Sequence, residues 1–270
     1  MSTAGPGHHA SRYLRTTGQH ATIDADTLIE GSFILSIGGA EQSHVNLADP
    51  REIFYEYLRR IGHVVDLAAG PGEPIRALHL GAGALTLARY IQATRPGSGQ
   101  YAVELERELL DFVLHKLPMP QGTLLSTHIG DARDALAELG TEAAFDVVIL
   151  DIFSGPEAPA HIACREFYEE AAARLGPEGV LIVNVGDEPA LTLVRSQVSA
   201  LREAMPDVAA VAETGMFEGR YPGNIILVGT RSKWSPEWTK ELLARGPHPA
   251  AVLTGMDLDR IAAQGSGSTR

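Results

Sequence analysis

The 270-residue chain is long enough for one large α/β domain with a small appendage, and 44% of its residues are hydrophobic, as in proteins with a packed core. Its net charge of −12 argues against a nucleic-acid partner, because phosphate binding requires clustered Lys and Arg. The acidity is compatible with a cationic substrate. The single cysteine, Cys164, excludes an intrachain disulfide and a multi-cysteine metal site.

The two ends of the chain differ in composition from its centre. Met1–Ser11 is rich in Gly, His and Ser and lacks the apolar core of a signal peptide. No apolar run reaches the roughly 18 residues of a membrane span. We therefore expect no membrane segment and a cytoplasmic protein. The predicted segments are a flexible N-terminus (1–20), a small β region with a linking helix (21–70), a main domain (71–250) and a C-terminal tail (251–270).

The predicted β region consists of short strands joined by glycine turns. Gly31-Ser32 and Gly38-Gly39 separate apolar segments, which is typical of a small antiparallel sheet. The strands are expected at Thr27–Glu30, Phe33–Ile37 and Ser43–Leu47. Asp49 and Pro50 then have the residue types of a helix N-cap and a first helical position, so a helix is predicted from there through Ile61.

From residue 76 the chain alternates between strand and helix patterns. Glu188–Met205 has apolar residues at spacings of three and four, which predicts an amphipathic helix. Val208–Thr214 and Gly223–Thr230 are both strand-like and are joined by a glycine-containing loop, which predicts an antiparallel hairpin. The preceding strands are expected at Ala77–Leu80, Tyr101–Leu105, Ser126–Ile129, Phe145–Asp151 and Val180–Val185. This order predicts an α/β protein with a Rossmann-like class I methyltransferase fold, whose mostly parallel sheet ends in an antiparallel hairpin and is preceded by the small β region.

A glycine turn follows the first strand of the main domain. Gly81 and Gly83 come directly after an apolar run, and Glu104 ends the next strand. In nucleoside-binding sheets such glycines let the backbone approach the ligand, and the acid accepts hydrogen bonds from the ribose hydroxyls. The third glycine of the dinucleotide pattern is missing, because Ala84-Leu85-Thr86 follows. The turn therefore favours an adenosine-type ligand such as S-adenosylmethionine over NAD, and it makes 71–250 a predicted nucleoside-binding domain.

Two more acids end strands of the same predicted sheet. Asp131 lies in Gly130-Asp131-Ala132, and Asp151 follows the apolar run Val147–Leu150. Ligands of open α/β sheets lie beyond the carboxyl ends of the strands, which nominates both acids for the site. Asp131 can cap the following helix and also accept a hydrogen bond from an adenine amino group. Asp151 can accept a proton from an amine nucleophile or orient its lone pair.

The order of these motifs resembles that of the spermidine synthases, which are aminopropyltransferases built on the methyltransferase fold. The resemblance covers about residues 25–232. It includes Glu41-Gln42-Ser43, Phe54-Tyr55-Glu56, the glycine turn, Val103-Glu104, Gly130-Asp131-Ala132, Asp151 with its Pro-containing loop, and Tyr221-Pro222-Gly223.

The resemblance implies a catalytic domain with a role for each of these positions. Asp151 would assist the attack of a diamine, and Tyr221 and Ser154 would line the amine side. The implied co-substrate is decarboxylated S-adenosylmethionine, or its intact form, the implied partner is a small cationic amine, and the implied assembly is a homodimer. The implied nucleoside-binding residues are Gln42 and Glu104 at the ribose and methionine-derived part, Asp131 and Ala132 at the adenine, and Gly81 and Gly83 in the turn.

Three positions depart from the family pattern. Ala84 stands where the family's glycine turn usually has an aspartate that contacts the aminopropyl amine. The loop Asp151–Pro156 lacks the family's second aspartate, and Phe54-Tyr55-Glu56 replaces the usual Tyr-His-Glu. Losing one charged partner of a buried amine costs about 2–5 kcal/mol. Three hypotheses therefore stay open: an aminopropyltransferase, a methyltransferase that uses intact S-adenosylmethionine, and a non-catalytic nucleoside-binding relative. The identity of the amine acceptor is not predicted.

Some remaining polar residues have structural interpretations. Asp187 can cap the predicted helix 188–205 or replace the missing carboxylate. None of the ten histidines has a metal-binding spacing with an acid on one helix, so no metal is expected. His79, inside the first strand of the main domain, is predicted to be a packed core residue.

Overall fold

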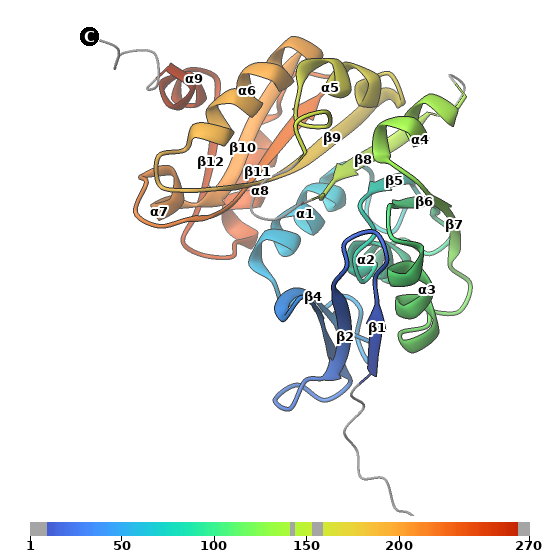
Figure 1. The fold of residues 1–270 in the computed structure, drawn as a ribbon. Helices are drawn as coiled ribbons and strands as arrows, with labels where there is room; N and C mark the ends of the chain where they lie inside the picture. The colour runs from blue at the N-terminus through green and yellow to red at the C-terminus, as the bar shows by residue number, and fades with distance from the viewer. Residues whose placement is uncertain (1–9, 141–143, 153–158, 264–270) are drawn as a thin grey trace, which may run out of the picture.

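Two β-sheets organise the chain, and helices cover both faces of the larger one (Figure 1). The computed structural model describes residues 10–140, 144–152 and 159–263. The strands of the larger sheet are β5 (Arg76–Leu80), β6 (Gly99–Glu104), β7 (Leu124–Ile129), β8 (Phe145–Leu150), β9 (Leu175–Asp187), β10 (Asp207–Glu213), β11 (Gly223–Thr230) and β12 (Ala250–Thr254). The helices are α1 (Glu56–Leu67), α2 (Thr86–Thr94), α3 (Arg107–Lys116), α4 (Ala132–Glu138), α5 (Arg165–Ala172), α6 (Thr192–Ala204), α7 (Thr214–Phe217), α8 (Pro236–Arg245) and α9 (Gly255–Ala263).

The larger sheet is parallel in one part and antiparallel at one end. Its strand order is β12-β10-β11-β9-β8-β5-β6-β7. β5 pairs in parallel with both β6 and β8, and β9 continues the parallel part beside β8. β11 runs antiparallel to β9, and β10 runs antiparallel to β11. The predicted fold class, a mostly parallel sheet that ends in an antiparallel hairpin, is therefore confirmed.

Alternate residues of the parallel strands enter two different cores. In β8, Val148 and Leu150 pack with residues of α4, α5 and α6, whereas Val147 and Ile149 pack with residues of α1, α2 and α8. Successive side chains of a strand point to opposite faces of its sheet, and both faces here are covered by helices. This double coverage explains why the strand is apolar at every one of these positions. Fully burying each such side chain contributes about 1.5–3 kcal/mol.

The smaller sheet is antiparallel and packs against the start of the main domain. Its strands are β1 (Ala10–Tyr13), β2 (His20–Ala25), β3 (Ser32–Ile37) and β4 (Ala40–Asn46). Ile23, Leu35 and Val45 share a core with Leu85 before α2 and Phe112 of α3. Figure 1 shows this sheet beside α2 and α3, below the larger sheet. The predicted small β region is confirmed, and it brings β4 next to the glycine turn.

Two predictions within the smaller sheet are wrong. Residues 10–13 were expected to be flexible, but they form β1, which pairs with β2 along its whole length and leads to the buried Leu14. The segment Thr27–Glu30 is not a strand. Asp26 Oδ1 accepts hydrogen bonds from the backbone amides of Leu28 and Ile29, and these bonds hold the chain in a turn. The sheet therefore begins earlier and has its second strand upstream of the predicted position.

The helix predicted from Asp49 begins at Glu56 instead. Asp49 Oδ1 accepts a hydrogen bond from the amide of Arg51, and the Asp49 carboxylate also pairs with the Arg51 guanidinium. These contacts form a local turn. Asp49 therefore accepts a backbone amide as an N-cap residue would, but no helix follows it.

The C-terminal segment from residue 251 is structured through Ala263, which corrects the predicted tail. β12 adds to the sheet beside β10, and α9 covers the same end with the buried Leu258 and Ile261. The helix predicted from Glu188 begins at Thr192 as α6. Its start is capped from upstream, because Asp187 Oδ2 accepts a hydrogen bond from the amide of Val194.

Candidate active site

A cavity of about 880 Å³ lies at the carboxyl ends of β5, β6, β7 and β8. β5 has parallel partners on both sides, and the chain leaves its carboxyl end between them, which is the place where open α/β sheets bind ligands. The smaller sheet forms the opposite wall through β4 and the turn after β1. The cavity brings together seven sequence-predicted site residues: Gln42, Gly81, Gly83, Glu104, Asp131, Ala132 and Asp151.

The glycine turn joins three strand ends. The amide of Gly81 donates to Val103 O at 3.0 Å, and the amide of Asp151 donates to Leu80 O at 2.9 Å. Gly81 has φ +95°, and a Cβ added there would collide with the carbonyl oxygen of Asp151. Glycine is therefore required for both reasons, conformation and space. The turn places the Asp151 backbone directly against the segment predicted to hold the nucleoside.

Glu104 is held against the same turn by backbone amides. Its carboxylate accepts hydrogen bonds from the amides of Glu106 at 3.0 Å and Ala82 at 3.2 Å. Burial raises the pKa of Glu104, and these hydrogen bonds partly offset that rise. The side chain is thus fixed in position at the end of β6, on the cavity wall.

Asp131 caps α4, as the sequence predicted. Its Oδ1 accepts a hydrogen bond from the amide of Arg133 at 2.8 Å, and its Oδ2 lies 2.8 Å from Nε2 of His161. Burial alone would raise the pKa of Asp131, but the hydrogen bonds from His161 and the Arg133 amide outweigh it and lower the pKa. His161 also lines the cavity. Sequence reasoning missed it, because its partner lies 30 residues upstream and no local pattern connects them.

Asp151 is held by an amide from the next strand. Asn184 Nδ2 donates to Asp151 Oδ1 at 2.8 Å, and Asn224 Nδ2 donates to Asn184 Oδ1 at 3.1 Å. Burial raises the pKa of Asp151, and the bond from Asn184 opposes this rise. Tyr57 of α1 lines the cavity nearby, and burial together with the Asp151 charge raises the pKa of its hydroxyl. The lone polar position in the apolar Val180–Val185 run was the signal that could have identified Asn184.

β4 contributes both a cavity residue and a contact to the glycine turn. Gln42 lines the cavity. The neighbouring Ser43 Oγ accepts a hydrogen bond from the amide of Ala84 at 3.4 Å. Ala84, which stands where the family usually has an aspartate, is buried against this strand. The position therefore contributes packing and a backbone amide, and no charge.

Of the two predicted substrate-side residues, Tyr221 and Ser154, the structure describes only Tyr221. Tyr221 is absent from the cavity wall as described, and its hydroxyl donates to the carboxylate of Glu213 at the end of β10. Ser154 lies outside the described residues. Asp187, the alternative carboxylate, accepts from the amides of Glu188 and Val194 with its two oxygens, so it caps α6.

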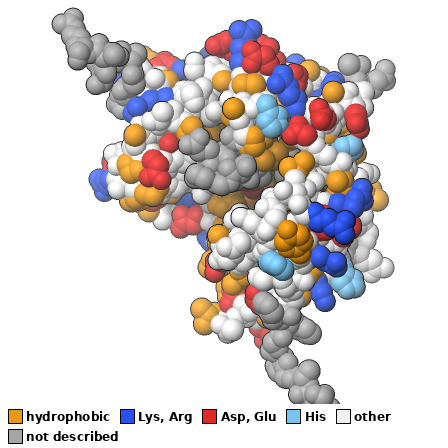
Figure 2. Space-filling model, viewed as in Figure 1, with side chains coloured by type: hydrophobic (Ala, Val, Ile, Leu, Met, Phe, Trp, Pro, Cys, Tyr) orange, Lys and Arg blue, Asp and Glu red, His pale blue; other side chains and the backbone are white. Residues whose placement is uncertain are grey.

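The wall of the cavity carries only negative formal charge among the described residues. Its acids are Glu104, Glu106, Asp131 and Asp151, and neither Lys nor Arg contributes to the wall within the described part of the chain. Figure 2 shows that on the outer face of the molecule basic side chains instead occur in small groups, several of them beside acidic ones. An electronegative, partly buried cavity favours a cationic ligand.

His79 is buried inside β5 and also lines the cavity. Its Nε2 is 2.9 Å from Gln100 Oε1, and burial lowers its pKa to about 4, so the ring is neutral at pH 7. The prediction of a packed core residue is confirmed.

Within residues 10–140, 144–152 and 159–263, no group of three or more His, Cys, Asp or Glu side chains is arranged to hold a metal ion. No helix in these ranges is long and apolar enough to cross a membrane.

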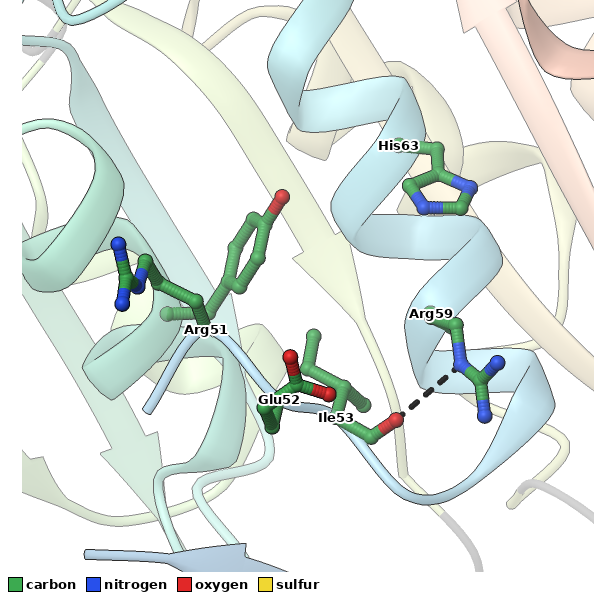
Figure 3. A pocket seen from close by; sticks show the side chains of 6 residues that line it. Arg51, Glu52, Ile53, Arg59 and His63 are labelled. Carbon is green, nitrogen blue, oxygen red and sulfur yellow. Dashed lines mark hydrogen bonds between the residues drawn. The ribbon is translucent and has the colours of Figure 1, made fainter. Parts of the chain in front are cut away.

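A second, smaller pocket of about 180 Å³ lies between α1 and the segment before it. Figure 3 shows Arg51 and Arg59 on opposite sides of this pocket. Arg59 donates to the carbonyl oxygens of Ile53 and Phe54, and Arg51 pairs with Asp49. Both guanidinium groups are therefore engaged within the chain. The larger cavity holds the predicted residues and is the candidate active site.

Comparisons with known proteins connect this site to named families. A probable spermidine synthase from Corynebacterium glutamicum is 30% identical, has a TM-score of 0.82, and is matched over 97% of this chain and 95% of that chain. A polyamine aminopropyltransferase from Vibrio vulnificus is 27% identical over 139 residues, which is 50% of this chain and 46% of the relative. Human methyltransferase-like protein 13, solved in complex with SAH, is 22% identical, has a TM-score of 0.57, and is matched over 77% of this chain and 93% of that chain.

The likeness to methyltransferase-like protein 13 shows that the fold is the methyltransferase fold. On that fold, the extent and identity of the match to the probable spermidine synthase show the family: the chain belongs to the spermidine synthase-like family of transferases. The aligned region spans about half, or less, of the length of the curated aminopropyltransferases it matches. No protein-family model matches the chain.

Proposed function

We propose that the protein is an aminopropyltransferase, which transfers the aminopropyl group of decarboxylated S-adenosylmethionine to a small cationic amine and releases methylthioadenosine. The observation that carries the proposal is the position of Asp151. Its backbone contacts the glycine turn, and its carboxylate lies in a cavity whose described wall has four acids and no Lys or Arg. Membership of the family and the name of the Vibrio vulnificus relative support the same reaction.

In this proposal the nucleoside lies along the carboxyl ends of β5, β6 and β7. Glu104 and Gln42 hold the ribose and the adjoining part of the nucleoside, and Asp131 with Ala132 holds the adenine. A carboxylate has about four lone-pair positions, so Glu104 can accept from ribose hydroxyls while it also accepts from two backbone amides. Gly81 and Gly83 let the ligand approach the backbone. The SAH bound to methyltransferase-like protein 13 is consistent with an adenosyl ligand for this fold.

The charge of the wall favours the decarboxylated form of the nucleoside. Intact S-adenosylmethionine carries a carboxylate, which would meet no Lys or Arg in the described wall. The decarboxylated form carries a sulfonium and an ammonium, and both are stabilised by surrounding acids. Ala84 removes the one aspartate that the family pattern would place at the ammonium, so the other acids of the wall have to supply that interaction.

The chemistry requires positioning and one proton transfer. The neutral amine nitrogen attacks the aminopropyl carbon bonded to the sulfonium, a new C–N bond forms, and the C–S bond breaks with its electron pair remaining on sulfur. Methylthioadenosine leaves as a neutral thioether. Asp151 accepts the proton that the new secondary ammonium loses, or the proton that the acceptor amine loses before attack. Tyr221 and Ser154 as amine-side residues, the homodimer, the absence of nucleic-acid and membrane partners, and the cytoplasmic location stay predictions.

Product analysis tests the proposal. The purified protein is incubated with decarboxylated or intact S-adenosylmethionine and a panel of diamines, and the nucleoside product is identified by mass spectrometry. Methylthioadenosine that forms only with an added amine is the expected result. Adenosylhomocysteine from the intact form would instead indicate a methyltransferase. Nucleoside binding without turnover for any amine would indicate a non-catalytic relative.

A further inference from the structure

Asn184 is a polar residue in the middle of an apolar strand. It lies on β9 between Val183 and Val185 and is only 3% exposed. A buried side-chain amide is costly unless its polar atoms are hydrogen-bonded. Here one end donates to Asp151 and the other accepts from Asn224. The three side chains therefore form one hydrogen-bonded chain that runs across three elements of the sheet to the cavity.

We propose that Asn184 and Asn224 are positioning residues that fix the carboxylate of Asp151 so that its second oxygen faces the amine substrate. This inference rests on the proposed function, and it adds two residues to the site that act through Asp151. The two asparagines lie on the same face of neighbouring antiparallel strands. Asn184 pairs with Ile226, and Asn224 lies two positions before Ile226 on β11.

The contact with Asn224 matches the orientation in which the NH₂ end of the Asn184 amide meets Asp151. An amide has a donor end and an acceptor end, and the two can exchange by a half-turn of the group. Because Asn224 Nδ2 donates to Asn184 Oδ1, the NH₂ group of Asn184 points to Asp151 Oδ1. In the reversed orientation a carbonyl oxygen would face the carboxylate and repel it. Asn224 thus acts on Asp151 without touching it.

The arrangement leaves one oxygen of Asp151 for a ligand. Among the described residues, Oδ1 accepts from Asn184 and Oδ2 has no hydrogen bond, while the residue lines the cavity. The titratable group coupled to Asp151 within that part of the chain is Tyr57 on α1, whose raised pKa keeps it neutral near pH 7. Loss of the Asn184 bond would therefore raise the pKa of Asp151 further, since burial would act unopposed.

The test compares Asn184→Ala, Asn224→Ala and the double variant with the wild type. Gln197→Ala is the matched control, because Gln197 is also a buried amide with two hydrogen bonds, to Tyr168 and to Ala163 O, and it does not line the cavity. The first readout is the titration of Asp151 by NMR in protein labelled at the Asp carboxyl carbons, with the signal assigned by its loss in Asp151→Asn. The second readout is the pH dependence of kcat and the KM for the nucleoside.

The hydrogen-bonded chain from Asn224 through Asn184 to Asp151, called the relay below, predicts a specific pattern of effects. In Asn184→Ala the titration midpoint of Asp151 rises, the acid limb of kcat moves to higher pH, and kcat falls about 10- to 100-fold, the effect of losing one hydrogen bond to a charged group. The KM for the nucleoside stays within about threefold. Asn224→Ala shifts the same quantities in the same direction by less, and the double variant equals Asn184→Ala because Asn224 acts through Asn184. Gln197→Ala lowers stability and leaves the Asp151 midpoint unchanged.

Three results would overturn the relay: an unchanged Asp151 midpoint in Asn184→Ala, an Asn224→Ala effect that adds in full to that of Asn184→Ala, or an equal midpoint shift in Gln197→Ala. If Asn184→Ala does not fold, the Asn224→Ala midpoint decides alone, and no shift there overturns the relay. The NMR titration needs no turnover. A wild type without aminopropyl transfer would therefore refute the proposed function separately, while the midpoints still test the relay.

Discussion

Hydrogen bonds of different kinds hold the two ends of the cavity that we propose for the nucleoside and for the amine, called the nucleoside end and the amine end below. At the nucleoside end, Glu104 and Asp131 each accept a hydrogen bond from at least one backbone amide, and Asp131 also contacts the side chain of His161. At the amine end, Asp151 is held by the side chain of Asn184, which comes from another strand. Backbone-held groups tolerate divergence at other positions, whereas a group held by side chains depends on each of them.

The largest expected effect separates the two ends directly. Asp151→Asn should lower kcat by about 10²- to 10⁴-fold, because it removes the proposed proton acceptor. Affinity for methylthioadenosine should change by no more than a few-fold, since the nucleoside end is left intact. Steady-state kinetics and calorimetric titration measure the two quantities. A large loss of nucleoside affinity with little change in kcat would contradict the proposal that Asp151 acts on the amine.

Glu104→Gln should produce the opposite pattern. It replaces one acceptor oxygen and removes a charge at the proposed ribose contact, so the Kd for methylthioadenosine should rise about 10- to 100-fold. The matched control is Glu108→Gln on α3, which removes an acid that pairs with the exposed Arg15 and does not line the cavity. Equal nucleoside affinity in the wild type and Glu104→Gln would contradict the ribose contact proposed for Glu104.

Gly81 lies between the two ends of the cavity, so Gly81→Ala should disturb the geometry of both ends. The φ of +95° and the collision with the Asp151 carbonyl should together lower the free energy of unfolding by at least about 1–3 kcal/mol. Gly72→Ala is the control, because Gly72 has φ +74° with open space around its Cβ position. Chemical denaturation compares the two variants. Equal losses of unfolding free energy in Gly81→Ala and Gly72→Ala would show that the contact with Asp151 has no energetic effect.

The smallest expected effect concerns His161 and Asp131. The pair is partly exposed, so His161→Ala should cost no more than about 1 kcal/mol of unfolding free energy. The pKa of Asp131 is lowered from its ordinary 3.8, so its contribution is present above that value and is lost as the pH falls through the lower pKa of the folded state. The difference between wild type and variant should therefore shrink as the pH falls below 3.8. A difference that grows on acidification would contradict this assignment.

Features encoded by local sequence were predictable. The apolar run before Gly81 and the run before Asp151 gave neighbouring parallel strands, and Asp131 capped α4 as expected. Strand-end acids share one edge of a parallel sheet, so their convergence on one cavity followed from the strand order alone. The errors at Asp26 and Asp49 have one cause: each side chain accepts backbone amides and forms a turn where the sequence pattern indicated a strand or a helix.

Side-chain partners from distant segments were not predictable. His161 meets Asp131, and Asn224 meets Asn184, only because the sheet and its connections bring them together. The C-terminal strand β12 was missed for a similar reason, since its five residues gain their stability from pairing with β10 rather than from their own pattern.

One measurement tests the central claim most directly. Equal concentrations of decarboxylated and intact S-adenosylmethionine compete for the wild-type protein in the presence of one diamine that supports turnover, and the nucleoside products are quantified by mass spectrometry. The acid-lined cavity predicts methylthioadenosine as the dominant product, in equal amount to the aminopropylated amine. Adenosylhomocysteine as the dominant product, with a methylated amine, would contradict the account.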